Sequence, residues 1–224
     1  MKILTFIKYF FYLGFNWNWR IAVYIIRFEV WGEKKYGIRT TGSDELTKMK
    51  AAGIDITHAT FYMPITYFQL EEIFAALPIT PRKHFVDIGC GKGRAICVAA
   101  HHGYPQVTGV DFSQQFCAEA TANLQLTKKH FPSLRFSVIQ KNAADFEIPA
   151  DADCIFFFNP FDIVIMKKVV ENIGKSLQTH PRSLHVVYAN PLYKELFLQR
   201  KFEEVHHSKR MNYLELSILK FRHP

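Results

Sequence analysis

The chain has 224 residues, a length that suits one ordinary domain with a buried core and an extension. Hydrophobic residues make up 49% of the chain and charged residues 21%, which excludes an intrinsically disordered or fibrous protein. Its 28 Lys and Arg against 20 Asp and Glu give a net charge of +8, which permits an anionic partner but is spread along the chain like an ordinary solvated surface.

The N-terminal segment, residues 1–28, is apolar and aromatic and is interrupted by Lys8 and Arg20. A membrane-spanning helix needs about 20 largely apolar residues without a central charge, so a span is not expected. A secretory signal is not expected either, because no small-residue cleavage site follows. Two interpretations stay open: a helical arm packed on its own domain or on a second subunit, or an interfacial helix whose basic residues face anionic lipid, namely Lys2, Lys8, Arg20 and Arg27.

The next stretch, residues 34–54, is polar and contains three glycines, so we expect a connection with little regular structure. We therefore divide the chain into an aromatic helical arm with its connection, residues 1–54, and a main domain, residues 55–224.

The main domain alternates between helical and strand patterns. A helix is predicted from Pro64, since proline suits a first helical turn, and Pro78 ends it. Short apolar runs bounded by turn residues then predict strands over 84–88, 106–110, 134–139, 154–158 and 184–189. Helices are predicted between and after them, over 94–102, 113–129, 162–177 and 193–200.

Two further strands are predicted at the end of the chain, over 202–206 and 213–221. Strands that alternate with helices pair in parallel through right-handed crossovers. The connection over 208–212 is too short for a crossover helix, so the last two strands must form an antiparallel hairpin. The predicted fold class is α/β, with a doubly wound, mostly parallel seven-stranded sheet that ends in a C-terminal antiparallel hairpin.

The turn after the first strand carries the most informative motif, which reads Asp87-Ile88-Gly89-Cys90-Gly91-Lys92-Gly93. Ligands of doubly wound sheets bind at the carboxyl ends of the strands, and glycines let a backbone turn tightly and approach a ligand closely. A phosphate loop requires Ser or Thr after the lysine, where this chain has Gly93. A dinucleotide loop has the spacing G-x-G-x-x-G, whereas the spacing here is G-x-G-x-G.

Two acids flank this loop. Asp87 lies near the end of the first strand and Asp111 ends the second. A carboxylate aimed at the loop repels a pyrophosphate and suits a ligand with an ammonium group, and an acid after the second strand can accept both hydroxyls of a ribose. The two acids therefore favour a nucleoside with a cationic amino-acid tail.

The glycine motif together with Asp111 resembles the class I S-adenosylmethionine-dependent methyltransferases, over residues 61–221 or thereabouts, including the terminal hairpin of their Rossmann-like fold. The resemblance implies S-adenosylmethionine as cofactor, with its methionine part against Gly89, Gly91 and Gly93 and its ribose on Asp111. In that family the acid that matches Asp87 organises the loop and often reaches the amino group through water.

Two more segments of the cofactor site follow from the same resemblance. After the third strand, Asn142 and Ala143 match the residues that grip the adenine, and a turn or helix cap is the alternative for Asn142. Upstream, the segment Phe61-Tyr62-Met63-Pro64-Ile65-Thr66 is similar to the Tyr-x-Pro segment of lysine methyltransferases of the ATP synthase c-subunit type. Tyr62 and Thr66 would then close over the methionine end, and a hydrophobic staple at a helix start is the alternative.

The fourth strand is followed by Asn159-Pro160-Phe161, where this family places its methyl-accepting site. Members that methylate amino groups often carry Asn-Pro-Pro-Phe or Asn-Pro-Pro-Tyr, and this chain lacks one of the prolines. The resemblance assigns Asn159, Pro160 and Phe161 as catalytic residues and favours a nitrogen acceptor. The alternative is a proline turn with Phe161 in the core.

No metal site is expected, because neither the four cysteines nor the pairs His101-His102 and His206-His207 have metal-ligand spacing. The cysteine pattern favours a reducing compartment, so we expect a cytoplasmic protein. Whether the N-terminal arm contacts a membrane stays open. The acceptor is left open among protein lysine, RNA and a small molecule, and so is the oligomeric state. A non-catalytic module that binds the cofactor or associates with a membrane is the alternative function, and an NAD-dependent enzyme is disfavoured by the loop spacing and Asp87.

Overall fold

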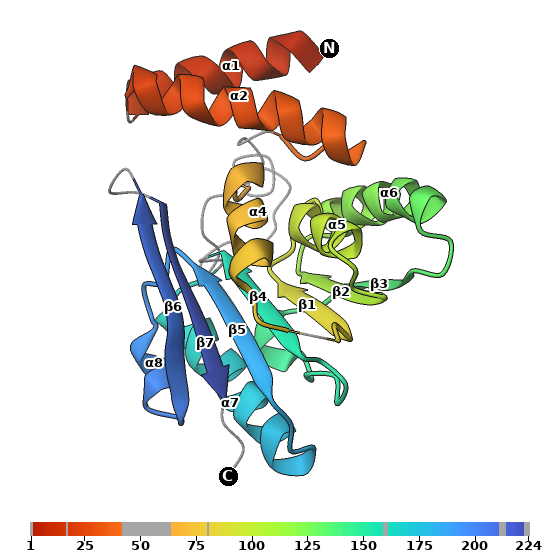
Figure 1. Ribbon diagram of the computed structural model, residues 1–224, viewed down its shortest axis with the longest axis vertical. Coiled ribbons are helices and arrows are strands. Elements are labelled where there is room, and N and C mark those ends of the chain that lie inside the picture. Colours follow the sequence, from red (N-terminus) through yellow and green to blue (C-terminus); the bar gives the residue numbers. More distant parts are fainter. Residues whose placement is uncertain are drawn as a thin grey trace.

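The computed structural model describes residues 2–16, 18–41, 64–79, 81–158, 161–210 and 214–221. Within these residues, seven strands form a single sheet in the order β3-β2-β1-β4-β5-β7-β6 (Figure 1). The strands are β1 His84–Ile88, β2 Gln106–Asp111, β3 Arg135–Gln140, β4 Cys154–Phe158, β5 Leu184–Ala189, β6 Phe202–Arg210 and β7 Leu214–Phe221. The helices are α1 Lys2–Asn16, α2 Trp19–Tyr36, α4 Tyr67–Ala76, α5 Arg94–His101, α6 Gln114–His130, η1 Ala143–Asp145, α7 Ile163–Thr179 and α8 Glu195–Leu198.

Strands β1 to β5 pair in parallel, and β7 runs antiparallel to both β5 and β6. This confirms the predicted doubly wound sheet and its C-terminal hairpin. The bounds predicted for β1, β4 and β5 agree with the structure. Strand β6 continues four residues beyond the predicted His206, to Arg210, because its polar residues pair with β7 at the sheet edge.

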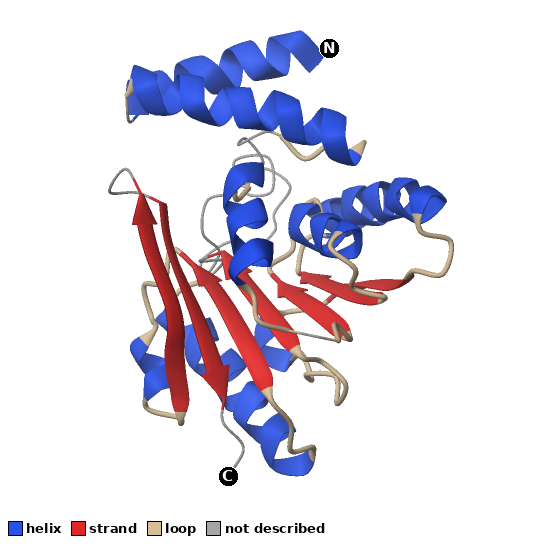
Figure 2. Cartoon of the chain, in the orientation of Figure 1, coloured by secondary structure: helices blue, strands red, loops and turns tan. Residues whose placement is uncertain are grey.

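Helices cover both faces of the sheet (Figure 2). On one face α4, α5 and α6 bury a cluster that includes Leu70, Ile96 and Leu124. On the other face α7 and α8 bury a second cluster with Met166, Ile173 and Phe197. The central strands β1 and β5 are buried along their whole length, and apolar residues fill most of their positions. The exceptions are His84 and Asp87 in β1 and His185 in β5.

Side-chain caps set the starts of three helices. The hydroxyl of Ser113 accepts a hydrogen bond from the Phe116 amide, as the sequence predicts for the start of α6. Asp162 lies just outside α7 and accepts from the amides of Val164 and Ile165. Helix α4 begins at Tyr67 and not at Pro64, because Thr66 is its cap.

The N-terminal arm is a hairpin of α1 and α2 that packs on its own chain. Its inner core consists of a small separate cluster, Tyr9, Leu13, Ile21, Ala22 and Ile25. Gly32 of α2 lies against the ring of Tyr67, where a Cβ would come within 2.0 Å of the ring carbon Cγ. This packing agrees with the first interpretation of the arm. None of the described helices combines the length and apolar character needed to cross a membrane.

Residues 34–36 of the predicted connection belong to α2, which Gly37 ends in the left-handed conformation with φ of 68°. The structure describes the connection up to Thr41, and residues 42–54 lie outside the described residues.

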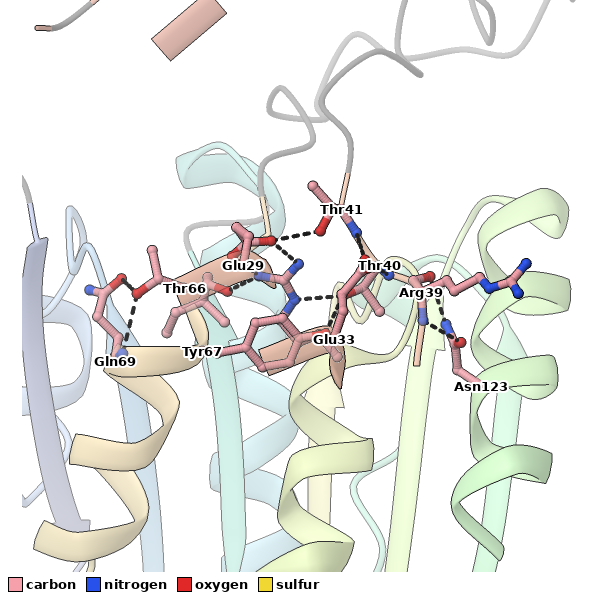
Figure 3. Close-up of polar contacts among 11 residues, drawn as sticks. Glu29, Glu33, Arg39, Thr40, Thr41, Thr66, Tyr67, Gln69 and Asn123 are labelled. Atoms are coloured by element: carbon pink, nitrogen blue, oxygen red, sulfur yellow. Dashed lines mark hydrogen bonds and ion pairs between the residues drawn. The ribbon is translucent and has the colours of Figure 1, made fainter. Parts of the chain in front are cut away.

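A buried ion pair joins this hairpin to the main domain (Figure 3). The guanidinium of Arg94 donates to both carboxylate oxygens of Glu29 at 2.6 Å, and the two side chains are only 3% and 1% exposed. Arg94 also donates to the Ile65 carbonyl and the Thr40 hydroxyl, both at 2.7 Å, and lies 4.1 Å from the centre of the Tyr67 ring. One arginine therefore holds together α2, the connection, the start of α4 and the start of α5.

We predict that Glu29→Gln lowers the free energy of unfolding of the docked arm by about 3–5 kcal/mol, because it leaves the Arg94 guanidinium buried without a charged partner. All three tryptophans of the chain lie within residues 17–31, so tryptophan fluorescence during urea titration reports on the arm.

The matched control is Lys34→Gln, an exposed position on the same helix, which should change the free energy by less than about 0.5 kcal/mol. Equal effects of the two substitutions would show that the ion pair does not hold the arm.

Candidate functional site

The glycine loop leaves the carboxyl end of β1 and leads directly into α5. Gly89, Gly91 and Gly93 have φ angles of 87°, 49° and 79°, in the left-handed region that favours glycine. The amides of Gly89 and Cys90 donate to the Val110 carbonyl at 2.8 and 3.0 Å. The loop is therefore fixed against the end of β2, at the strand edge where doubly wound sheets bind their ligands.

Two glycines of this region are also required by close packing. A Cβ on Gly93 would lie 2.9 Å from the Cβ of Ala120 in α6. A Cβ on Gly109, inside β2, would lie 2.8 Å from the sulfur of Cys90. Cys90 is thus a packing residue of the loop, and its burial beside Asp111 and Asp87 raises the pKa of its thiol well above the usual value.

Asp111 connects the loop to the next helix. One of its carboxylate oxygens accepts from the Gly91 amide at 2.9 Å and the other accepts from the Ser113 amide at 2.9 Å. Burial raises the pKa of Asp111 to about 6, while these amides act in the opposite direction. A carboxylate has about four lone-pair positions, so Asp111 retains acceptor capacity beyond these two bonds.

Asp87 lies on the adjacent strand, where it pairs in register with Gly109 of β2. Its side chain is buried, and burial followed by the nearby charge of Asp111 raises its pKa well above the usual range. Two carboxyl groups that are costly to ionise together favour a cationic ligand, because a positive charge lowers the cost of ionising both.

The turn after β3 lies beside Asp111. Strand β3 pairs with β2, so that Gln140 is opposite Asp111, and the Lys141 amide donates to the Asp111 carbonyl at 2.9 Å. Asn142 then caps the short helix η1 by accepting from the Ala144 amide at 2.9 Å, and Ala143 is buried. Asn142 therefore has the capping role weighed from the sequence, at the edge where the adenine residues were expected.

The remaining predicted site residues are described only in part. Thr66 is buried, and its hydroxyl caps α4 through the Gln69 amide at 3.2 Å. The ring of Phe161 is buried and contacts Phe157, with centroids 6.5 Å apart. The predicted residues Tyr62, Asn159 and Pro160 lie outside the described residues.

The comparisons with known proteins agree with this geometry. Residues 85–180 match the family model of a methyltransferase domain. This match identifies residues 85–180 as a methyltransferase domain. The matched range begins in β1 and includes the glycine loop, Asp111 and the strand that precedes Phe161.

Similar proteins support the methyltransferase fold. The ribosomal protein L11 methylase of Lactobacillus delbrueckii subsp. bulgaricus superposes with a TM-score of 0.53 at 14% identity, over 75% of this chain and 84% of that one. A putative S-adenosylmethionine-dependent methyltransferase of Listeria monocytogenes gives 0.52 at 15% identity, over 70% and 98%. Both identities are low enough that they establish the fold alone.

Among curated proteins, the chain is similar to trans-aconitate 2-methyltransferase of Delftia acidovorans, with 32% identity over 68 residues. The matched residues make up 30% of this chain and only 23% of that enzyme's length.

Sequence reasoning missed Arg94, which follows Gly93 directly, and its partner Glu29. A signal was present for Arg94, because it is the single Lys, Arg, Asp or Glu of an otherwise apolar helix, and such a charge needs a partner when it is buried. Glu29 gave no such signal, because α2 carries several other charged residues. Nothing in the sequence, however, indicates that these two residues are partners. Within the ranges that the structure describes, no group of three or more His, Cys, Asp or Glu side chains could hold a metal ion. This does not contradict the expectation that the chain has no metal site.

We predict that Gly93→Ala destabilises the methyltransferase domain more than Gly103→Ala. Both glycines have a positive φ, so alanine costs about 1–2 kcal/mol of backbone strain at either position. Only Gly93 has a neighbour in contact range, Ala120, so its variant should lose about 1–3 kcal/mol more. Chemical denaturation of the two variants measures the difference, and equal losses would mean that helices α5 and α6 separate without cost.

Proposed function

We propose that this chain catalyses methyl transfer from S-adenosylmethionine. The observation that carries the proposal is the buried Asp111 carboxylate, which is hydrogen-bonded to the Gly91 amide at the tip of a loop with three left-handed glycines. The loop has no side chains at Gly89, Gly91 and Gly93, so a ligand can approach its backbone, and the acid beside it suits a ribose.

The chain's own residues fit this methyl donor. In the proposed complex the glycine loop binds the methionine part, Asp111 accepts the ribose hydroxyls, and Asp87 attracts the ammonium group. Asn142 and Ala143 contact the adenine, since the turn that contains them is joined to Asp111 by the Lys141 amide. Tyr62 and Thr66 close over the methionine end, as the similarity to the c-subunit lysine methyltransferase type suggests.

For methyl transfer the protein has mainly to position the donor and the acceptor. When bound, the donor would supply a sulfonium methyl group for in-line attack by the acceptor; the bond from sulfur to this methyl would break, and the donor would leave as a neutral thioether. The protein contributes by aligning the two reactants and excluding water. The Phe157 and Phe161 rings near the end of β4 are buried in the core cluster that α7 and α8 cover.

For the acceptor we propose a nitrogen atom, of a protein lysine or another amine. The support is the segment Asn159-Pro160-Phe161, which partly matches the acceptor motif of amino-methylating enzymes. Asn159 would orient the nitrogen through its side-chain oxygen, and Phe161 would pack near it. An amine must arrive deprotonated to attack, and Asn159 has no basic group to remove its proton.

We expect Asp111→Asn to weaken the binding of S-adenosylhomocysteine about tenfold or more, because an amide offers one acceptor oxygen where the carboxylate offers two. Isothermal titration measures the affinity. The control Glu171→Gln removes a partly exposed acid on α7 and should leave the affinity unchanged. Unchanged affinity in Asp111→Asn would contradict the assigned ribose site.

The affinity for S-adenosylhomocysteine, measured by the same titration, should depend on pH. The pKa of Asp111 is raised to about 6 by burial, so lowering the pH through this value protonates the acid and removes an acceptor. Affinity should therefore fall between about pH 7.5 and about pH 5, by at most about tenfold per pH unit for this group. The change of affinity with pH should be smaller in Asp111→Asn, where any remaining pH dependence comes from Asp87. A wild-type affinity that is equal at both pH values would exclude an ionised Asp111 in binding.

We expect Asn159→Ala to slow methyl transfer while leaving the affinity for S-adenosylhomocysteine unchanged, because its proposed place is at the acceptor. Uptake of labelled methyl groups into the fractions of a cell lysate measures transfer and also identifies the acceptor class. Asn190→Ala, after β5, is a comparison at another strand end. Equal loss of transfer and affinity in Asn159→Ala would mean that Asn159 is structural.

A further inference from the structure

The outward side of α1 carries a continuous apolar stripe. Leu4, Ile7, Phe11 and Phe15 recur at helical spacing and are exposed by 58%, 47%, 48% and 77%. The opposite side of the same helix, with Tyr9 and Leu13, is buried against α2. A helix that is apolar on both sides is typical of one that is buried on both sides, but here the described residues cover only one side.

The stripe continues across the turn onto α2. The ring of Trp19 lies against Gly14, where a Cβ would come within 2.1 Å of it, and its centroid is 6.1 Å from Phe11 and 5.3 Å from Phe15. Beyond Trp19, which is 46% exposed, α2 exposes Val23 by 58% and Val30 by 49%. Patches of this kind mark interaction surfaces.

The charges that border the stripe are positive. Arg20, Arg27 and Lys34 are exposed and follow each other at intervals of seven residues, so they lie on one side of α2 beside Val23 and Val30. The two acids of the helix point elsewhere. Glu29 is bound to Arg94, and Glu33 accepts from the backbone amides of residues 40 and 41 at 3.1 Å.

We propose that this outer face of the hairpin docks on the surface of an anionic lipid bilayer. We define the outer face as Leu4, Ile7, Lys8, Phe11, Phe15, Trp19, Arg20, Val23, Arg27, Val30 and Lys34. Aromatic and aliphatic side chains enter the headgroup region while the neighbouring cations meet lipid phosphates. Two copies of the chain joined through this face would instead bring its cations close together, which is unfavourable.

The docking has a geometric consequence for the rest of the molecule. The hairpin lies along the edge at which the parallel strands end, above the start of α4 (Figure 1). Glu29 and Arg94 tie α2 to the residue that follows the glycine loop. A docked hairpin therefore holds this edge of the sheet next to the bilayer at a fixed orientation.

The experiment is co-sedimentation of the full chain with vesicles of phosphatidylglycerol and phosphatidylcholine, compared with phosphatidylcholine alone, without methyl donor. We expect binding to the anionic vesicles that weakens as salt is raised. Because all three tryptophans lie within residues 17–31, their emission should shift to the blue on binding. The readout does not use the donor site, so it separates failure of docking from failure of the proposed methyl transfer.

Two double variants test the two components of the face. Arg20→Glu with Arg27→Glu should weaken binding to anionic vesicles about tenfold or more, and Phe11→Ser with Phe15→Ser should do the same. The matched charge control is Lys167→Glu with Lys168→Glu, exposed on α7 across the sheet, and the matched apolar control is Leu192→Ser. Both controls should bind like the wild type.

Absence of binding to anionic vesicles at low salt would overturn the proposal, as would equal losses in the controls. Light scattering of the free chain provides the other decisive result. A stable dimer that dissociates in the Phe11→Ser, Phe15→Ser variant and does not bind vesicles would mean that a second copy covers this face.

Discussion

The contact between Glu29 and Arg94 is the constraint on which the arrangement of this protein depends. A guanidinium that is 3% exposed is tolerated only with its charge and its hydrogen bonds satisfied. The four partners of Arg94 come from three separate parts of the chain: the Glu29 carboxylate, the Thr40 hydroxyl, and the Ile65 carbonyl with the ring face of Tyr67. Because Arg94 is also the first residue of α5, the docked arm and the end of the glycine loop share one anchor.

The loop itself is held by a different kind of interaction. Backbone amides of Gly89 and Cys90 bind the end of β2, and the Gly91 amide binds Asp111, so main-chain donors fix the loop before any ligand is present. The cost lies in the two buried acids, Asp87 and Asp111, whose pKa values are raised. A ligand with a positive charge would stabilise the ionised form of these buried carboxyl groups. The two acids beside the loop therefore suit the proposed methyl donor.

The two sides of the α1–α2 hairpin have different roles. The inner side is fixed by the separate small core around Leu13 and Ile25 and by Glu29, whereas the outer side exposes aromatic residues next to cations. The proposed docking and the proposed methyl transfer therefore meet at the same edge of the sheet. An acceptor that is carried in or on a membrane would reach this edge directly, whereas one dissolved in water would need no such hairpin.

Local patterns in the sequence were sufficient for much of the fold. Largely apolar runs predicted β4 and β5 with their observed bounds, since strands buried on both sides have few polar positions. Ser113 predicted the start of α6, because a cap needs only a side chain and the amides that follow it. The glycine spacing and Asp111 predicted the edge that holds the site. The extension of β6 to Arg210 was missed, because pairing with β7 and not local propensity stabilises these polar residues.

The sequence by itself determined the alternation of strands and helices, the glycine loop and the class of fold, since each depends on residues close together in the chain. It left two interpretations of the aromatic arm, and only the tertiary structure decided that the arm packs on its own domain. The physical reason is that Glu29 and Arg94 are 65 residues apart, so no local pattern relates them. Only the folded chain brings the two charges to 2.6 Å and excludes water from them.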